Sequence, residues 1–196
     1  MSNLFQTLEF EAFRKGITPR TKESREWFRK RLGNMRRVDR RELMRNDPVK
    51  LATRTLMGSM QMFIYDPKHK ETLPYYDAFP LTIVIGPAPG GFAGINLHYL
   101  PPLMRARFLD GLMERMTDKK YDESTRFAVS YQYLKKASTS KYIAPTYKHY
   151  LTQHVRSKFA RIPAPEWEIA TFLPAADWRK QSGKAVYRDT RRMVNG

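Results

Sequence analysis

The sequence predicts an α+β fold, in which a small antiparallel sheet packs against several helices and an extended basic helical arm forms the N-terminus. Three features support this prediction. Apolar runs around residues 56–66, 81–85 and 92–98 are joined by loops, as in neighbouring antiparallel strands. An amphipathic helical pattern follows the third run. Residues 14–50 hold 14 Lys or Arg against 5 Asp or Glu, which favours an arm laid on a partner.

The chain therefore divides into a basic helical arm, residues 1–54, and an α+β core domain, residues 55–196, that ends in a basic tail. In the arm, the segment TKESREWFRKRLGNM spaces apolar residues at helical intervals, and Asp39 with Glu42 begins a second short helix as a capping box. Repulsion between the many arginines disfavours a compact isolated arm. We therefore expect residues 1–50 to be mobile in the free protein and to become ordered in an assembly.

The first two apolar runs predict strands and the turn that follows them. The segment LMGSMQMFIYD, residues 56–66, alternates so that both faces are mostly apolar, as in a strand buried on both sides. The motif GPAPGG, after the second run, has the glycines of a phosphate-binding loop, but Pro87 and Pro89 each remove a backbone N–H donor. No Lys-Ser or Lys-Thr pair follows it. The motif predicts a β-turn in which Gly90 or Gly91 has a positive φ.

Helical patterns dominate the rest of the core domain. Pro101-Pro102 opens the clearest one, whose buried face is formed by Leu103, Met104, Phe108, Leu109, Leu112, Met113 and Met116. Asp122 caps a second helix that runs to about Lys136. Pro145 begins a third, with inward positions at Tyr147, Leu151 and Val155. The proline-broken stretch RIPAPEWEIATFLPAADW is expected to wrap the surface of the core.

The residue types that carry catalysis or bind metals are sparse. The chain of 196 residues has no cysteine, so it has no disulfide and no thiolate metal site, which fits a reducing compartment. The N-terminus lacks the pattern of a secretory signal, and no run of 18 apolar residues predicts a membrane span. The histidines lack metal-ligand spacing, and one carboxylate grouping stands out; these residues are His69, His98, His149 and His154, and Glu166, Glu168 and Asp177. We expect surface or structural roles for all of them, hence no catalytic residue, metal, cofactor or small-molecule substrate.

The charge is the most informative property of the sequence. A formal net charge of +17 favours a polyanion or a strongly acidic protein surface as partner. Eleven tyrosines are interleaved with the basic residues, and none of the signatures of base-reading domains is present, so double-stranded DNA bound without sequence specificity is the expected partner. The candidate DNA-binding residues are Arg25, Arg29, Arg36, Arg37, Arg40, Arg41, Arg45, Lys148, Arg156, Lys158, Arg188, Arg191 and Arg192.

Three segments resemble a known group of proteins. They are YDPKHKETLPYYDAFPL, GGFAGINLHYLPPLMRARFLDGLM and PAPEWEIATFLPAADWRK, which together cover roughly residues 66–192. They resemble virion proteins of T-even-like contractile-tailed bacteriophages, among them DNA end protectors and structural proteins of the head or tail. The resemblance implies a component of the phage particle, made in the host cytoplasm. It assigns no catalytic or binding residue to a numbered position.

Together these observations predict a non-enzymatic structural component of a tailed-phage virion. Its basic arms would contact DNA or neighbouring subunits of the portal, neck, tail or baseplate, with the genome end as one such place. One alternative is a tail or baseplate assembly subunit whose partners are all proteins. A second alternative is a phage nuclease, which would require divalent metal ions to cleave DNA.

Overall fold

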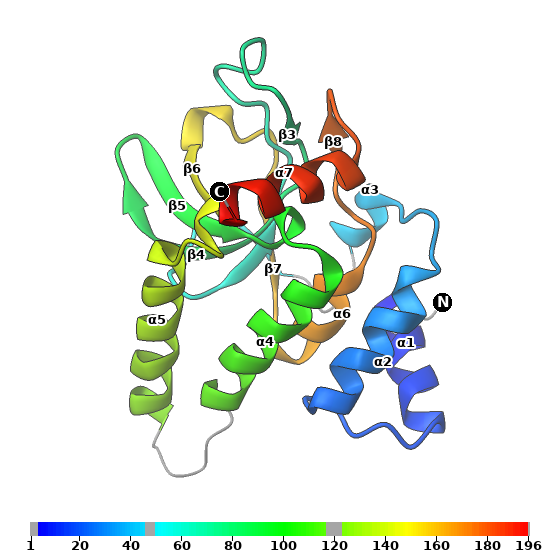
Figure 1. Ribbon diagram of the computed structural model, residues 1–196. Helices are drawn as coiled ribbons and strands as arrows, with labels where there is room; N and C mark the ends of the chain where they lie inside the picture. Colours follow the sequence, from blue (N-terminus) through cyan, green and yellow to red (C-terminus); the bar gives the residue numbers. More distant parts are fainter. Residues whose placement is uncertain (1–3, 46–49, 117–122, 196) are drawn as a thin grey trace.

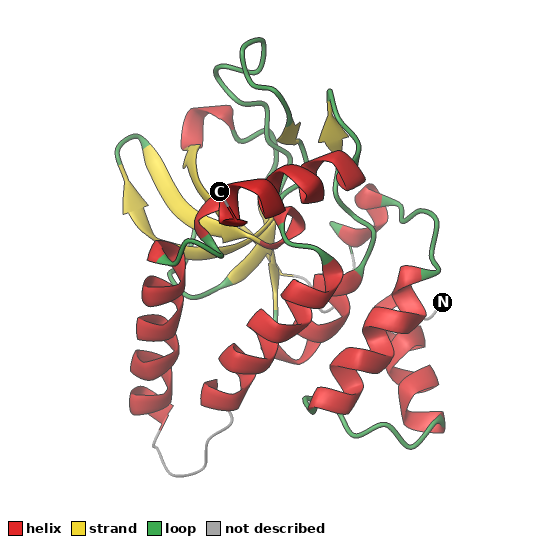
Figure 2. Ribbon diagram, in the orientation of Figure 1, coloured by secondary structure: helices red, strands yellow, loops and turns green. Residues whose placement is uncertain are grey.

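The computed structural model describes residues 4–45, 50–116 and 123–195, and the strands within these ranges form two antiparallel sheets (Figures 1 and 2). The strands are β1 (Lys50–Ala52), β2 (Met60–Met62), β3 (Tyr76–Asp77), β4 (Leu81–Ala88), β5 (Gly91–Asn96), β6 (Tyr147–Leu151), β7 (Phe159–Ile162) and β8 (Trp178–Arg179). The larger sheet has the order β1-β7-β2-β4-β5-β6, and β3 pairs with β8 in the smaller one.

Helices lie around the larger sheet, as Figure 2 shows in red. They are α1 (Leu4–Arg14), α2 (Lys22–Gly33), α3 (Arg40–Leu43), α4 (Pro102–Met116), α5 (Glu123–Thr139), α6 (Trp167–Phe172) and α7 (Gly183–Asn195). Helix α4 buries most of the face expected of it, including Phe108, Leu109, Leu112 and Met113. The predicted α+β class, with an antiparallel sheet packed against helices, is therefore confirmed.

The segment after Pro145 is a strand, so the helix predicted there is wrong. Residues Tyr147–Leu151 form β6, which pairs antiparallel with β5 over its whole length. Tyr150 is buried on one side of β6 while Tyr147 and His149 are exposed, which is the two-residue alternation of a strand. The helical spacing in this short segment was coincidental, because aromatic residues suit a strand beside an existing sheet edge.

The GPAPGG motif is a turn between two paired strands, as predicted. Ala88 of β4 lies opposite Gly91 of β5, so Pro89 and Gly90 form the connection. Gly90 has a φ of +69°, a conformation that glycine adopts without the steric cost of a side chain. A proline followed by a glycine with positive φ is typical of a type II turn.

The predicted strand over residues 56–66 is shorter than expected but has two apolar faces. Met60 and Met62 of β2 are buried in the main core, which also receives the helices. Phe63 and Tyr65 follow on the opposite face, in an aromatic cluster with Val84, Phe92, Tyr150 and Phe159. Leu56 and Met57 are exposed, so the strand does not extend over them.

Helices α1 and α2 are packed into the same core as the sheet. Phe5 and Leu8 of α1, and Phe28 and Leu32 of α2, are buried within it. Helix α2 contacts α4 and α6, and Figure 1 shows α1 and α2 side by side next to them. These two helices therefore bury apolar residues within the protein itself, where their narrow apolar stripes meet residues that are distant in the sequence.

The C-terminal region contributes both a buried and a surface helix. All six residues of α6 are buried, so this part of the proline-broken stretch lies inside the core, contrary to the expectation that it wraps the surface. Helix α7 packs through Val186 and Thr190 and exposes its arginines. The basic tail expected from the sequence is thus largely helical.

Candidate nucleic-acid interface

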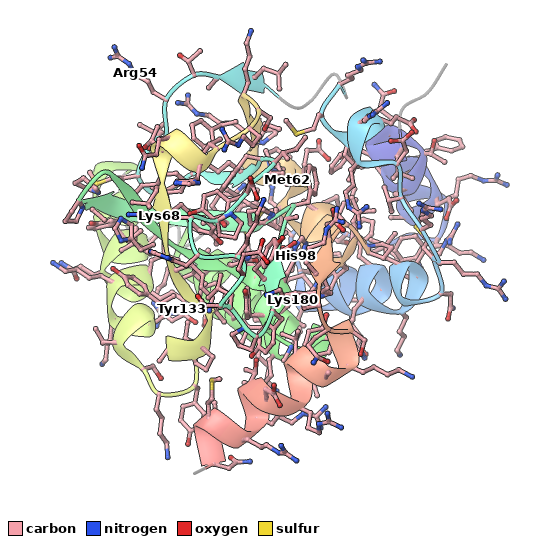
Figure 3. All side chains as sticks on the ribbon, turned by 90° about the horizontal axis from the view of Figure 1, so that it is seen from above. Arg54, Met62, Lys68, His98, Tyr133 and Lys180 are labelled. Carbon is pink, nitrogen blue, oxygen red and sulfur yellow. The ribbon has the colours of Figure 1, made fainter. Side chains whose placement is uncertain are left out.

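Basic side chains project around the whole outline of the molecule, as the nitrogen-tipped sticks in Figure 3 show. Charge alone therefore does not mark one binding face, and hollows lined by these side chains are more informative. Two such hollows contain or adjoin most of the basic residues selected from the sequence. We name them the arginine groove and the tyrosine pocket.

The arginine groove is a hollow of about 1030 Å³ between α3, its flanking residues and the segment before and within β8. Five arginines and two aspartates are among the residues that line it: Arg37, Arg40, Arg41, Arg45, Arg179, Asp39 and Asp177. Asp39 caps α3 by accepting hydrogen bonds from the backbone N–H groups of Arg41 and Glu42, at 2.8 and 3.3 Å. This cap sets the direction of α3 and hence of its arginines.

Arg40 attaches α3 to the opposite wall of the groove. Its Nε donates to the carbonyl of Ala175 at 2.8 Å, and its Nη2 donates to the carbonyl of Ala176 at 2.7 Å. Asp177 accepts from Arg179 at 2.7 Å and lies 3.8 Å from Arg40. Both aspartates of the groove therefore already have partners within the protein.

Three groove arginines remain available to an external anion. Arg37, Arg41 and Arg45 are exposed, and the described part of the chain contains no ion pair for any of them. Their guanidinium groups can each present several N–H donors to phosphate oxygens. This half of the groove thus has the chemistry of a phosphate-backbone site.

Other predicted residues flank the groove. Arg36 is exposed beside Arg37, and the exposed Arg156 and Lys158 adjoin Ser157, which lines the groove. Arg156 has one long contact, 3.8 Å to Asp66. These residues enlarge the basic surface around the arginine groove, but they do not line the groove itself.

The tyrosine pocket, about 450 Å³, lies at β6, β3 and the loop before β3. Lys148 of β6 lies within it, with its Nζ 4.0 Å from the centre of the Tyr99 ring. Burial lowers the pKa of Lys148 to about 8. Met193 of α7 also lines the pocket, and α7 exposes Arg188, Arg191 and Arg192 near this end of the helix.

Two of the candidate residues are engaged elsewhere. Arg25 is 6% exposed; its Nε donates to Asp110, and its Nη1 donates to Glu168 at 3.2 Å. Arg29 forms an ion pair with Glu26 one turn earlier on α2. Arg25 therefore links α2 to α4 and α6, and its side chain is buried between these helices.

Sequence reasoning missed several residues of the two hollows. Arg179 lines the arginine groove, and Tyr75, Tyr76 and Tyr99 line the tyrosine pocket. The consecutive tyrosines in LPYYD were a usable signal, because a polar loop with adjacent aromatic rings is a common element of binding sites. Nothing in the sequence predicts that this loop lies beside β6.

The carboxylates that are grouped in the sequence do not form one site, because Glu168 and Asp177 make different contacts. Glu168 accepts from the Ser24 hydroxyl at 2.7 Å and from Arg25, whereas Asp177 lies in the arginine groove. Within residues 4–45, 50–116 and 123–195, no three His, Cys, Asp or Glu side chains are grouped so that they could hold a metal ion. In the same ranges, no helix has the length and apolar character to cross a membrane.

His98 lies in the middle of the molecule, as Figure 3 shows, whereas Arg54 points outward at its edge. The His98 Nδ1 is 2.7 Å from Asp77 Oδ2, and the Asn96 side-chain amide donates to the same oxygen at 3.3 Å. Burial lowers the pKa of His98, so its ring is neutral near pH 7. This agrees with the structural role expected for His98.

The chain matches a known protein family over nearly its whole length. The family model described as phage T4 terminal DNA protecting protein matches residues 2–191. No curated protein and no solved structure matches the chain. The family match includes the N-terminal helices, whereas the resemblance noted in the sequence begins near residue 66.

Proposed function

The chain belongs to the phage T4 terminal DNA protecting protein family, and on this premise we propose that it binds the end of double-stranded phage DNA through the arginine groove and shields it. The binding is electrostatic and independent of base sequence. The observation that supports this proposal is the group of exposed arginines, Arg37, Arg41 and Arg45, on one wall of the groove. The role is non-enzymatic, since protection requires only that the DNA terminus be covered.

The flanking cations extend this contact along the duplex. Arg36, Arg156 and Lys158 lie beside the groove, and each can neutralise a further phosphate. Arg25 is left out of the proposed interface because its guanidinium is held by Asp110 and Glu168. Portal, neck, tail or baseplate proteins remain candidate neighbours in the particle, and the virion is the proposed location.

A salt titration of DNA affinity tests the proposal. The wild-type chain and the variant Arg37→Ala/Arg41→Ala/Arg45→Ala are compared on a random-sequence duplex by fluorescence anisotropy. The slope of log affinity against log salt should fall by about 0.9 for each lost phosphate contact. The matched control, Lys15→Ala/Lys22→Ala/Lys30→Ala, removes three exposed charges that do not line the groove and should keep the wild-type slope.

Exonuclease digestion provides the functional measurement. The wild-type protein should slow digestion of a linear duplex, and the groove variant should not. If the wild-type chain fails to bind DNA even at low salt, the proposal is wrong and a tail or baseplate role with protein partners becomes preferred. Cleavage of DNA that depends on added Mg²⁺ would instead support the nuclease alternative.

A further inference from the structure

Lys148 is a half-buried cation, and none of the described residues that line its pocket forms an ion pair with it. Asp77 is the carboxylate among the pocket residues, but its oxygens point to the protein interior. One oxygen accepts from the backbone N–H groups of Phe79 and Asp177, both at 3.0 Å, and the other contacts His98. Because an unpaired ammonium group is costly to remove from water, the pocket favours an external anion.

The walls of the pocket are aromatic and are held in place. Tyr75 lies directly before β3 and Tyr76 is the first residue of β3, and both are only partly exposed. Lys180 donates from Nζ to the carbonyls of Glu71 and Leu73, at 2.7 and 3.0 Å, which ties the loop before β3 to the segment after β8. The Tyr75 ring also packs against Trp178, with the two ring centres 6.3 Å apart. The rings therefore form a surface on which a planar group can stack.

The tyrosine pocket and the arginine groove share a wall. Tyr65 and Asp77 line the pocket, while their chain neighbours Ile64 and Ala78 line the groove. The pocket, at about 450 Å³, is within the range of roughly 300–1,000 Å³ that small-molecule sites occupy. A nucleic-acid strand bound in the groove therefore has, across this wall, a hollow that suits one nucleotide.

We propose that the tyrosine pocket binds the terminal nucleotide of a DNA strand, with its 5′-phosphate on Lys148 and its base against Tyr75 and Tyr76. This inference rests on the proposed function, because it presupposes that DNA lies in the arginine groove. It explains how a protein without base-reading elements can distinguish an end from the interior of a duplex. Stacking on aromatic rings tolerates any base, and an internal nucleotide has no free terminal phosphate to offer.

The test compares three DNA molecules of the same sequence: a blunt duplex with 5′-phosphates, the same duplex with 5′-hydroxyls, and a dumbbell closed by hairpins. The full chain should bind the phosphorylated duplex about tenfold more tightly than the dumbbell. Lys148→Met should remove the preference for the phosphate while keeping affinity for the dumbbell. Tyr76→Leu, which keeps the lysine, should reduce the preference for open ends, and Lys22→Met should change neither.

The outcomes separate this inference from the proposed function. Equal affinity of the wild-type chain for the open duplex and the dumbbell would overturn the pocket but leave groove binding intact. An unchanged end preference in Lys148→Met, with a wild-type circular dichroism spectrum, would also overturn it. Deoxyadenosine 5′-monophosphate should compete weakly with the phosphorylated end. If it instead binds tightly to the pocket while no DNA shows an end preference, the site serves free nucleotides and the inference is wrong.

Discussion

At Arg25 the molecule buries a cation between carboxylates from two other helices. The guanidinium contacts Asp110 of α4 and Glu168 of α6, and Glu168 also accepts hydrogen bonds from Ser24 and from the backbone N–H of Arg20. This network joins α2 to the core through charged groups. Removing one member leaves the remaining buried charges without compensation, which costs more than the loss of a surface ion pair.

We therefore predict that Arg25→Met lowers the free energy of unfolding by about 3–5 kcal/mol. The control is Arg29→Met, which removes the partly exposed pair with Glu26 on the same helix and should have little effect. Urea denaturation of both variants measures the difference. Equal stabilities for the two variants would show that the Arg25 network does not hold α2 to the core.

Glu166 should make the stability of the fold depend on pH. Burial, followed by repulsion from Glu9 of α1, raises the pKa of Glu166 to about 7, while Arg20 opposes the rise. Because this pKa lies above the ordinary value of 4.5, the folded state holds the proton more tightly than the unfolded state does. The stabilising effect is therefore present below about pH 4.5 and is lost as the pH rises through 7.

The variant Glu166→Gln keeps a neutral side chain at every pH, so its melting temperature should fall less than that of the wild type between pH 5 and pH 8. Glu23→Gln, at an exposed position on α2, should follow the wild type. Differential scanning calorimetry at the two pH values gives the comparison. A wild-type pH dependence in Glu166→Gln would mean that this carboxyl does not carry the effect.

Among the elements, the β4–β5 hairpin depends on two glycines for different reasons. Gly90 has a positive φ, with Leu151 Cδ2 at 3.4 Å from the position of an added Cβ. At Gly91 an added Cβ would lie 1.8 Å from the carbonyl oxygen of Tyr150. The close approach of β6 to β5 therefore requires glycine at position 91, whereas position 90 requires it for the turn.

We predict that Gly90→Ala costs roughly 1–2 kcal/mol, from placing a non-glycine residue at positive φ. Gly91→Ala should be the more damaging change because β6 has to move. Thermal unfolding measures both, and amide chemical shifts of β6 should change more in Gly91→Ala. Gly33→Ala, with no atom within 4 Å of the new methyl group, serves as the control. If Gly90→Ala proves the more disruptive, the packing of β6 against Gly91 is misassigned.

The elements also show which sequence patterns were reliable. The Pro-Gly turn and the α4 pattern were both found, because each depends on a local conformation or on a long run with one period. The short segment at Tyr147–Leu151 was misassigned, because five residues fit both a helical and a strand spacing. The segment is a strand because it pairs with β5, which lies some fifty residues earlier in the chain.

At the scale of the whole molecule, the basic N-terminal helices share the hydrophobic core of the sheet. The sequence predicts mobility for residues 1–50, yet Phe5, Leu8, Phe28 and Leu32 are buried in the main core. Burial of these side chains opposes the mutual repulsion of the surface arginines. The arginine groove is formed only when α3 lies against the segment that ends in β8.

We consequently expect the amides of α2 to be protected from hydrogen exchange in the free protein, to an extent comparable with α4. Exposed residues 36 and 37, between α2 and α3, should exchange faster and become protected when DNA is added. Hydrogen exchange followed by mass spectrometry, with and without a duplex, makes this measurement. Rapid exchange throughout α1 and α2 in the free chain would restore the expectation of a mobile arm, and the division of the chain near residue 54 would gain support.

The sequence by itself determined the properties that are additive or local. These are the net charge, which favours an anionic partner, the absence of cysteine, the α+β class, the turn at Pro89-Gly90 and the helix after Pro101. Only the tertiary structure decided which arginines face solvent and which, like Arg25, are enclosed. It also placed Tyr75 and Tyr76 in the lining of the same pocket as Lys148. The physical reason is that burial and ion pairing depend on contacts between residues more than seventy positions apart, which no local pattern encodes.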